Sequence, residues 1–278
     1  MPNHARLVFS VPKPPSKQST RDNPDETITW INKRLRELIE SFKQTSGNTD
    51  SVLDLGAYMV IYSTIHQCTV TKDHGGELPG KRLYFELADI VRSHCRDLRK
   101  EILRTHPEAA DQDLAVVEIY AREWKRHCKL AKLVAHNYRY MERHWVQHER
   151  CNGTPGVYPI QELHSMIWRE EVAIGSSQAG QSMKATNDDP ESILDIAVRL
   201  CKREGFNPEG ELDLQASELL QEVFKSFEET GIRIGTWGAT DEDCMLRPEI
   251  VAQHETLRSG LKITTRVPVV DTWRGRVR

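Results

Sequence analysis

Apolar residues recur every three or four positions along most of the chain between residues 24 and 230. The longest such stretch, residues 112–149, contains no glycine or proline. Its large apolar side chains stand at Val117, Tyr120, Trp124, Cys128, Ala131, Val134, Tyr138, Met141 and Trp145. This spacing gathers them on one face of a helix, while charged residues occupy most of the other faces. The pattern predicts a long helix, kinked or split in two, that packs against other helices.

Other segments show the same periodicity, separated by glycine, proline and short polar runs. The predicted helices run from Pro24 through Phe42, over about 51–68, from Leu83 through Ile102, over 112–149 and 159–172, from Asp189 to about Arg203, and over Leu212–Thr230. Pro24 and Pro159 suit the first position of a helix, where a missing N–H group costs nothing. Strand signals are too few for a sheet. The sequence therefore predicts an all-α protein.

Composition divides the chain into five parts. Residues 1–23 are rich in proline, serine and scattered charge, and we expect them to be disordered. The main helical unit covers 24–172, and a glycine- and serine-rich linker covers 173–188. A smaller helical unit covers 189–232. In the tail, 233–278, glycine and proline interrupt a weak periodicity, so we expect poor order there.

The helix predicted over about 51–68 has an unusual apolar run. All six residues from Ala57 to Tyr62 are apolar or amphipathic. Successive helical positions are about 100° apart, so these residues cover nearly the whole circumference. A domain core takes one stripe, and the remaining faces must meet another helix layer or a partner. The residues alone favour complete internal burial, with a partner-binding face as the alternative.

Charge and cysteine usage limit the functional classes. The 278 residues carry a net charge of −3 without a concentrated basic excess, so nucleic-acid binding is not expected. The six cysteines never form Cys-x-x-Cys, which indicates reduced thiols in an intracellular protein. No window approaches the roughly 18 apolar residues of a membrane span. We expect a cytoplasmic or nuclear protein that does not bind membranes.

Candidate reactive groups do not form a recognisable site. His144 and His148 are four residues apart and could present two imidazoles to one metal ion. Trp145, however, stands where a His-Glu-x-x-His motif has its glutamate, and no third ligand is implied. No acid–base or nucleophile constellation stands out elsewhere. We therefore expect no metal, no cofactor and no enzymatic activity.

Four stretches follow one another in a characteristic order. They are Ala57–Tyr62 with Cys68-Thr69; Leu83-Tyr84 with Leu87; Tyr120-x-x-x-Trp124 with Lys132 and the run Arg139–Val146; and Gly156-Val157-Tyr158 followed by Trp168-Arg169. In this order and at these separations they resemble the first repeat of the cullin ubiquitin-ligase scaffolds of the SCF type. The resemblance covers residues 28–172 well and 190–232 faintly. It implies a cullin-repeat helical bundle with a complete first repeat and a partial second repeat.

The resemblance also implies an interaction module. In SCF-type cullins, the second and fifth helices of the first repeat grip an SKP-type adaptor and the adjoining F-box protein. The corresponding positions here are Tyr58, Met59, Tyr62, Ile65, His66, Tyr140 and Arg143. Tyrosine and methionine suit such a face, because they offer large contact areas with a polar tip or a flexible chain. The alternative is a structural or self-associating helical domain with a degenerate partner face.

The chain also departs from the family pattern. A full cullin is far longer, and its later part binds the RING-box protein and carries the lysine modified by a Nedd-type ubiquitin-like protein. No such segment is recognisable here, so we expect a truncated scaffold that does not bind the RING-box protein. One residue before Cys68 is missing, and His66 stands where many relatives have an aromatic residue. Both differences predict weaker adaptor binding than is usual in the family.

Overall fold

The computed structural model describes residues 11–44, 55–76, 78–104, 111–175, 192–203 and 214–232. Every regular element within these ranges is helical, which confirms the predicted all-α class. The elements are α1 (Lys17–Asp22), α2 (Pro24–Gln44), α3 (Leu55–Val70), α4 (Gly80–Arg104), α5 (Gln112–Asn137), α6 (Arg139–Met141), the π-helical segment η2 (Glu142–Val146), α7 (Gln147–Cys151), α8 (Ile160–Trp168), the π-helical segment η3 (Arg169–Ile174), α9 (Ile193–Arg203) and α10 (Leu214–Glu229).

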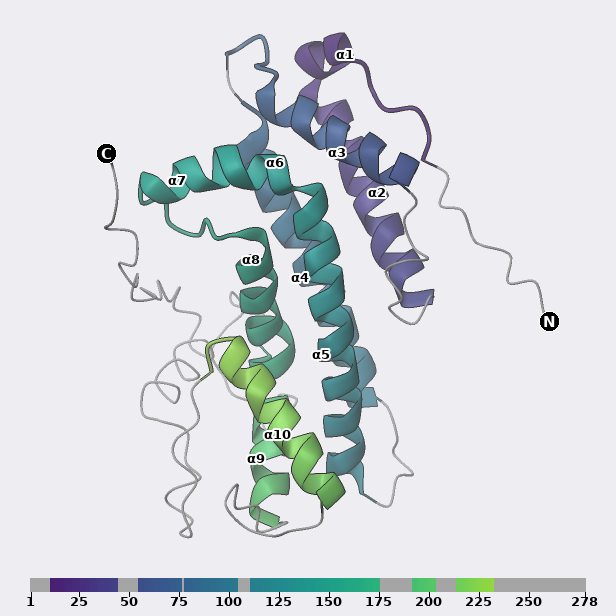
Figure 1. Cartoon of the computed structure of the whole chain (residues 1–278), viewed down its shortest axis with the longest axis vertical. Coiled ribbons are helices and arrows are strands. Elements are labelled where there is room, and N and C mark those ends of the chain that lie inside the picture. The colour runs from purple at the N-terminus through teal and green to yellow at the C-terminus, as the bar shows by residue number, and fades with distance from the viewer. Residues whose placement is uncertain are drawn as a thin grey trace, which may run out of the picture.

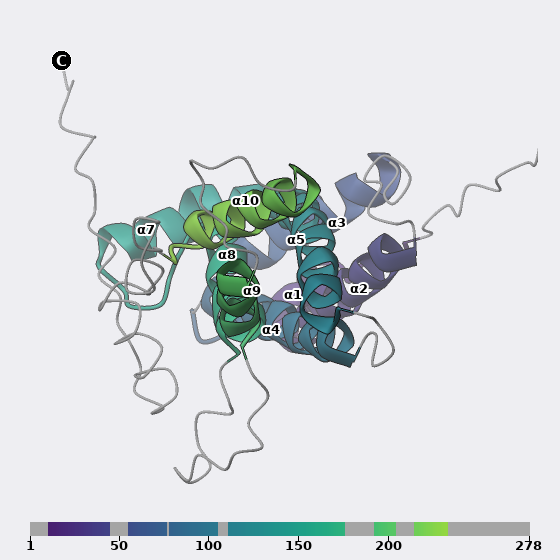
Figure 2. The same ribbon diagram turned by 90° about the horizontal axis from the view of Figure 1, so that it is seen from below.

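Helices α4, α5 and α8 run side by side along the long axis of the molecule (Figure 1). Helices α1, α2 and α3 gather toward one end, where α6 and α7 cross the bundle, and α9 and α10 lie toward the other end (Figure 1). The view from below shows α4, α5 and α8 nearly end-on, with α10 crossing α5 (Figure 2). This arrangement leaves α3 on the outside of the end that α6 covers.

The long periodic segment 112–149 is split, as the sequence predicts. Helix α5 ends at Asn137, and Tyr138 leaves helical geometry with φ −92° and ψ 7°. The Asn137 side chain donates a hydrogen bond to the carbonyl oxygen of Leu133 at 2.9 Å, a local bond that competes with the helical pattern. Tyr138 itself is fully buried and anchors the corner. The chain then continues across the bundle through α6, η2 and α7 (Figure 1).

One continuous core joins the N-terminal helices to α9 and α10. The indole N–H of Trp168 donates to the Tyr120 hydroxyl at 3.2 Å, and that hydroxyl shares a 3.0 Å hydrogen bond with Ser226 on α10. The indole N–H of Trp124 donates to Glu229 at 3.3 Å. The two helical units predicted from composition therefore share a single core, with α10 packed on α5.

The structure corrects two boundary predictions. Residues 17–22, expected to be disordered, form α1, because Ser16 caps the helix by accepting from the Ser19 N–H at 3.0 Å. Thr20 is buried and hydrogen-bonded to Thr27, a tertiary contact that sequence periodicity does not show. Ala173 and Ile174, assigned to the linker, belong to η3 and are buried. The rest of the segment predicted to be disordered (1–10), the rest of the predicted linker (176–188) and the whole predicted tail (233–278) lie outside the described residues.

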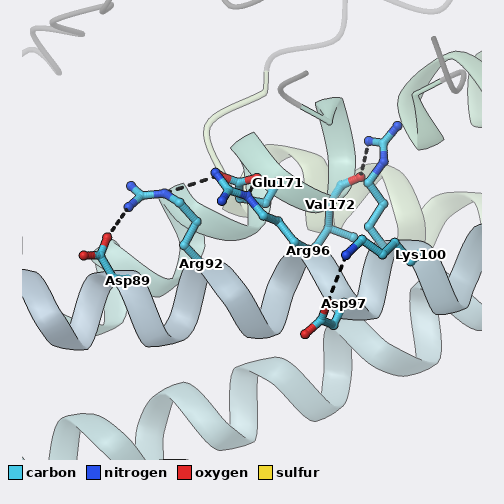
Figure 3. Close-up of polar contacts among 8 residues, drawn as sticks. Asp89, Arg92, Arg96, Asp97, Lys100, Glu171 and Val172 are labelled. Carbon is cyan, nitrogen blue, oxygen red and sulfur yellow. Dashed lines mark hydrogen bonds and ion pairs between the residues drawn. The ribbon is translucent and has the colours of Figure 1, made fainter. Parts of the chain in front are cut away.

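A charged cluster fastens η3 to α4. The Glu171 side chain is only 4% exposed, and its carboxylate accepts from Arg96 at 2.8 and 3.1 Å and lies 3.3 Å from Arg92. Figure 3 shows both arginines reaching from α4 toward this carboxylate. Arg99, one turn further along α4, donates to the carbonyl oxygen of Val172 at 3.3 Å. These contacts hold the end of the α8–η3 segment against α4, ahead of the chain that leads to α9.

Candidate partner-binding surface

Helix α3 presents an apolar side to solvent. Its buried residues fall on one face: Ala57, Ile61, Thr64, Ile65, Cys68 and Thr69. On the other side, Met59 is 49% exposed and Leu55 is 76% exposed. Tyr58 and Tyr62 are half-buried between the two sides. The complete internal burial that the residues alone favoured is therefore wrong, and part of the apolar circumference faces outward.

Aromatic rings continue this side of α3 onto the neighbouring helices. Tyr58 stacks on Tyr62 with ring centroids 5.8 Å apart and lies 5.6 Å from the His136 ring at the end of α5. A second series joins His66 to Tyr140 at 4.1 Å and Tyr140 to His144 at 4.3 Å. We call the surface formed by Tyr58, Met59, Tyr62, His66, Tyr140 and Arg143 the aromatic face. Of the seven residues singled out in the sequence, Tyr58 and Tyr62 contact each other, as do His66 and Tyr140, while Met59 on α3 and Arg143 on η2 are exposed.

Ile65 is the exception. Its side chain is 0% exposed and belongs to the hydrophobic core, three residues after Tyr62 on the inner side of α3. A side chain enclosed in this way cannot contact a partner in this structure. The assignment of Ile65 to the partner surface is therefore wrong, and the residue serves to seat α3 on the bundle.

His66 takes part in the ring packing of this surface. The imidazole packs edge-on against the Tyr140 ring, with an interplanar angle of 75°. This contact links α3 to α6 across the face. His66 therefore preserves the ring packing, although an imidazole offers less apolar area to a partner than a benzene ring does.

The tyrosine hydroxyls of the aromatic face are available for hydrogen bonding. Burial raises the pKa of Tyr58, with a further increase from Tyr62 and an opposing effect of Arg139. The hydroxyl therefore stays protonated at neutral pH. Among the described residues, no side-chain hydrogen bond involves the hydroxyls of Tyr58, Tyr62 or Tyr140. Each hydroxyl can thus donate to and accept from water or a partner.

The helix that carries the aromatic face is firmly seated. Ile61, Ile65 and Cys68 insert into the core. On the side toward α1, the Gln67 amide donates to the Thr20 hydroxyl. The exposed side chains are thus presented by a packed helix rather than by a loop. A surface of this kind loses little conformational freedom when it binds.

Two face residues went unrecognised in the sequence. His136 and His144 flank Tyr140 by four residues in each direction, and their rings contact Tyr58 and Tyr140. Helical spacing around Tyr140 was the signal that could have identified them. His144 is accordingly part of a ring stack. The other histidine of this stretch, His148, contacts Glu149 and Asn152.

In the ranges given above, no three or more His, Cys, Asp and Glu side chains gather in a way that could hold a metal ion. None of the helices described is both long and apolar enough to cross a membrane.

Comparison with known proteins identifies the family. The family model of the cullin alpha solenoid domain matches residues 34–234. Cell division control protein 53 of Saccharomyces cerevisiae is 22% identical over 165 residues, covering 54% of this chain and 19% of that protein. Cullin-1 of Dictyostelium discoideum is 28% identical over 96 residues, covering 34% and 12%. Cullin-1 of Schizosaccharomyces pombe is 29% identical over 134 residues, covering 44% and 17%.

The matched region thus spans less than one fifth of each of these relatives. The family match covers most of the chain, and its limits run from within α2 to just beyond the last described residue. It includes α3, α6 and η2, which carry the aromatic face. The chain belongs to the cullin family.

Proposed function

We propose that this chain is a scaffold module that docks an SKP-type adaptor together with its F-box protein, within a ubiquitin-ligase assembly. The observation that carries the proposal is the partly exposed aromatic face in a cullin-family chain. By the resemblance of the sequence, its residues correspond to the positions through which SCF-type cullins grip the adaptor. The module acts by holding its partners and needs no reaction centre of its own.

The composition of the aromatic face fits this role. Met59 offers a flexible apolar side chain at the surface, and Tyr58 and Tyr62 stack to form a broad ring platform beside it. Tyrosine and arginine are enriched among the residues that dominate binding energies, because they combine buried area with hydrogen bonding. Arg143 is exposed on η2 and would supply a charged rim.

A scaffold accelerates transfer by proximity. Two bound partners meet at an effective concentration set by the geometry of what holds them. The single core from α2 to α10 makes this module a stiff holder. We propose that it acts in the cytoplasm and nucleus, where SCF-type assemblies would encounter it.

The test replaces the ring platform. Tyr58→Ala combined with Tyr62→Ala should weaken binding to a recombinant adaptor–F-box pair by about a thousandfold, since each such aromatic contributes roughly 2 kcal/mol or more. Because both side chains are half-buried at the surface, the helical circular-dichroism signal should remain mostly intact. Binding is measured by isothermal titration calorimetry with the full 278-residue chain.

Phe85→Ala is the matched control. Phe85 is an exposed aromatic residue on α4, outside the aromatic face, and its removal should leave adaptor affinity within about twofold. Unfolding of the double variant would contradict the proposal, because a core aromatic costs about 3–5 kcal/mol when truncated. Unchanged adaptor binding by a folded double variant would also contradict it. Self-association without adaptor binding by the wild-type chain would favour the alternative, a structural helical domain.

A further inference from the structure

A separate cleft opens beside the aromatic face. It has a volume of about 500 Å³ and lies where the end of α5, the crossing segment α6–η2–α7 and the start of α8 meet. Lys132 comes from α5, Arg139 from α6, Arg143 from η2 and Arg150 from α7. Because the chain turns at Tyr138, basic residues spread over 19 positions of sequence surround one concavity. Pockets for small ligands commonly have this size.

The lining of the cleft has an excess of positive charge. Four of its residues are basic and one, Glu142, is acidic, which leaves a net charge of +3 with His136 neutral. Glu142 is partly buried and hydrogen-bonded to the backbone of Ile160 at the start of α8. Arg150 lies near enough to lower the pKa of Glu142 against the dominant effect of burial, which raises it. Lys132, Arg139 and Arg143 have no acidic counterpart in the cleft.

Several arginines elsewhere in the described residues are held by carboxylates: Arg82 by Asp25 and Glu86, Arg96 by Glu171, Arg126 by Glu123, Arg199 by Asp113, and Arg203 by Asp111. In the described part of the chain, none of the four basic cleft residues forms an ion pair or a side-chain hydrogen bond. The chain as a whole has a net charge of −3, so these unpaired cations make the cleft a local site that attracts an anionic ligand.

The charge density favours phosphate over carboxylate. A guanidinium group matches the oxygens of a phosphate through two parallel hydrogen bonds, and a phosphate monoester brings about −1.5 to −2 charges and three acceptor oxygens. A carboxylate brings one charge and two oxygens. Two phosphate groups would offset the excess of the cleft within its volume, whereas carboxylates would have to converge from several side chains.

We propose that this cleft binds a ligand carrying two or more phosphate groups, either a free small molecule or a multiply phosphorylated peptide segment. Lys132 and Arg150 lie outside the aromatic face, whereas Arg139 is close enough to Tyr58 to influence its pKa. His136 lines the cleft and also contacts Tyr58, and Arg143 belongs to the aromatic face, so the test leaves both in place.

The test titrates the full chain with inorganic tripolyphosphate by calorimetry at low salt. We expect one site per chain, and we expect Lys132→Gln with Arg139→Gln and Arg150→Gln to weaken it by about tenfold or more. The matched control, Arg82→Gln with Arg122→Gln and Arg199→Gln, removes the same total charge from paired surface positions. It should leave the affinity within about twofold. Circular dichroism checks folding, and Arg139→Gln alone serves if the triple variant unfolds.

Two further probes distinguish the source of the phosphate. Tighter binding of tripolyphosphate than of a peptide with two phosphoserines indicates a small-molecule ligand, and the reverse order indicates a phosphopeptide. Hexaglutamate binding as tightly as either would overturn the phosphate assignment. Absence of a saturable site for both phosphate probes, or equal weakening in the two triple variants, would overturn the site itself. Adaptor binding by a Lys132→Gln, Arg150→Gln variant, which leaves the neighbours of Tyr58 unchanged, reports separately on the aromatic face.

Discussion

Two buried histidines, His127 and His164, lie together in the bundle with the half-buried His94. His127 on α5 has its ring 6.5 Å from that of His94 on α4 and 5.2 Å from that of His164 on α8. Burial lowers the pKa of His127 to about 4 and that of His94 to about 3, with nearby cations adding to the second decrease. Burial likewise places the pKa of His164 well below its usual value. All three are therefore neutral in the folded protein near pH 7.

This cluster predicts destabilisation in mild acid. Between about pH 6.5 and 4 the unfolded chain binds protons at these histidines and the folded chain does not, so the free energy of unfolding falls as the pH decreases. Each histidine contributes up to about 1.4 kcal/mol per pH unit in this range. Urea unfolding at pH 7.5 and 5.5 should show the loss, and His127→Gln should reduce its slope.

An exposed histidine provides the control for that slope. His148→Gln removes a histidine whose side chain is 70% exposed, and the pH dependence should remain as in the wild type. Equal unfolding free energies at pH 7.5 and 5.5 in the wild-type protein would contradict the assignment of neutral buried histidines.

At the scale of elements, the join between α4 and η3 depends on one carboxylate. Glu171→Gln should lower the free energy of unfolding by about 1–2 kcal/mol, because Glu171 is buried while Arg92 and Arg96 reach solvent and can be hydrated once unpaired. Asp97→Asn is the control, since it removes an exposed pair with Lys100 on the same helix (Figure 3). That change should cost less than about 0.5 kcal/mol. Similar losses in the two variants would argue against the join.

The elements also show what sequence can and cannot reveal. Apolar periodicity located the long helices because it depends on local spacing, and a kink or split was expected within 112–149 without a position; the structure places it at Tyr138. Helix α1 escaped notice because its stability comes from the Ser16 cap and from burial of Thr20 against α2. The π-helical segments shift the side-chain register by one residue, and periodicity over five or six residues does not resolve such a shift.

The candidate site was predictable to a similar extent. The resemblance identified partner-binding positions on α3 and α6 but gave no information on how exposed each side chain is. Ile65 was therefore included, although the core encloses it. The basic cleft was not foreseen. In the sequence, its basic residues fit the spacing of one long, uninterrupted helix. Only the turn at Tyr138 brings them around a concavity next to α8.

At the scale of the whole molecule, α9 and α10 should behave as part of one body. The hydrogen bonds from Tyr120 to Ser226 and from Trp124 to Glu229 join α10 to the centre of the bundle. After limited proteolysis under native conditions, we expect the fragment containing α10 to remain with α5 in gel filtration. Early release of α9 and α10, or early cleavage within residues 112–149, would contradict this packing.

The central claim is that the aromatic face binds the adaptor and so keeps it from other scaffolds. An adaptor held by these 278 residues cannot sit on a full-length cullin at the same time. The most direct measurement adds increasing amounts of the chain to a reconstituted SCF-type reaction and follows substrate ubiquitination. The account predicts a decline in proportion to adaptor occupancy, and no decline with the Tyr58→Ala, Tyr62→Ala variant. An unchanged or increased rate at saturating wild-type chain would contradict it.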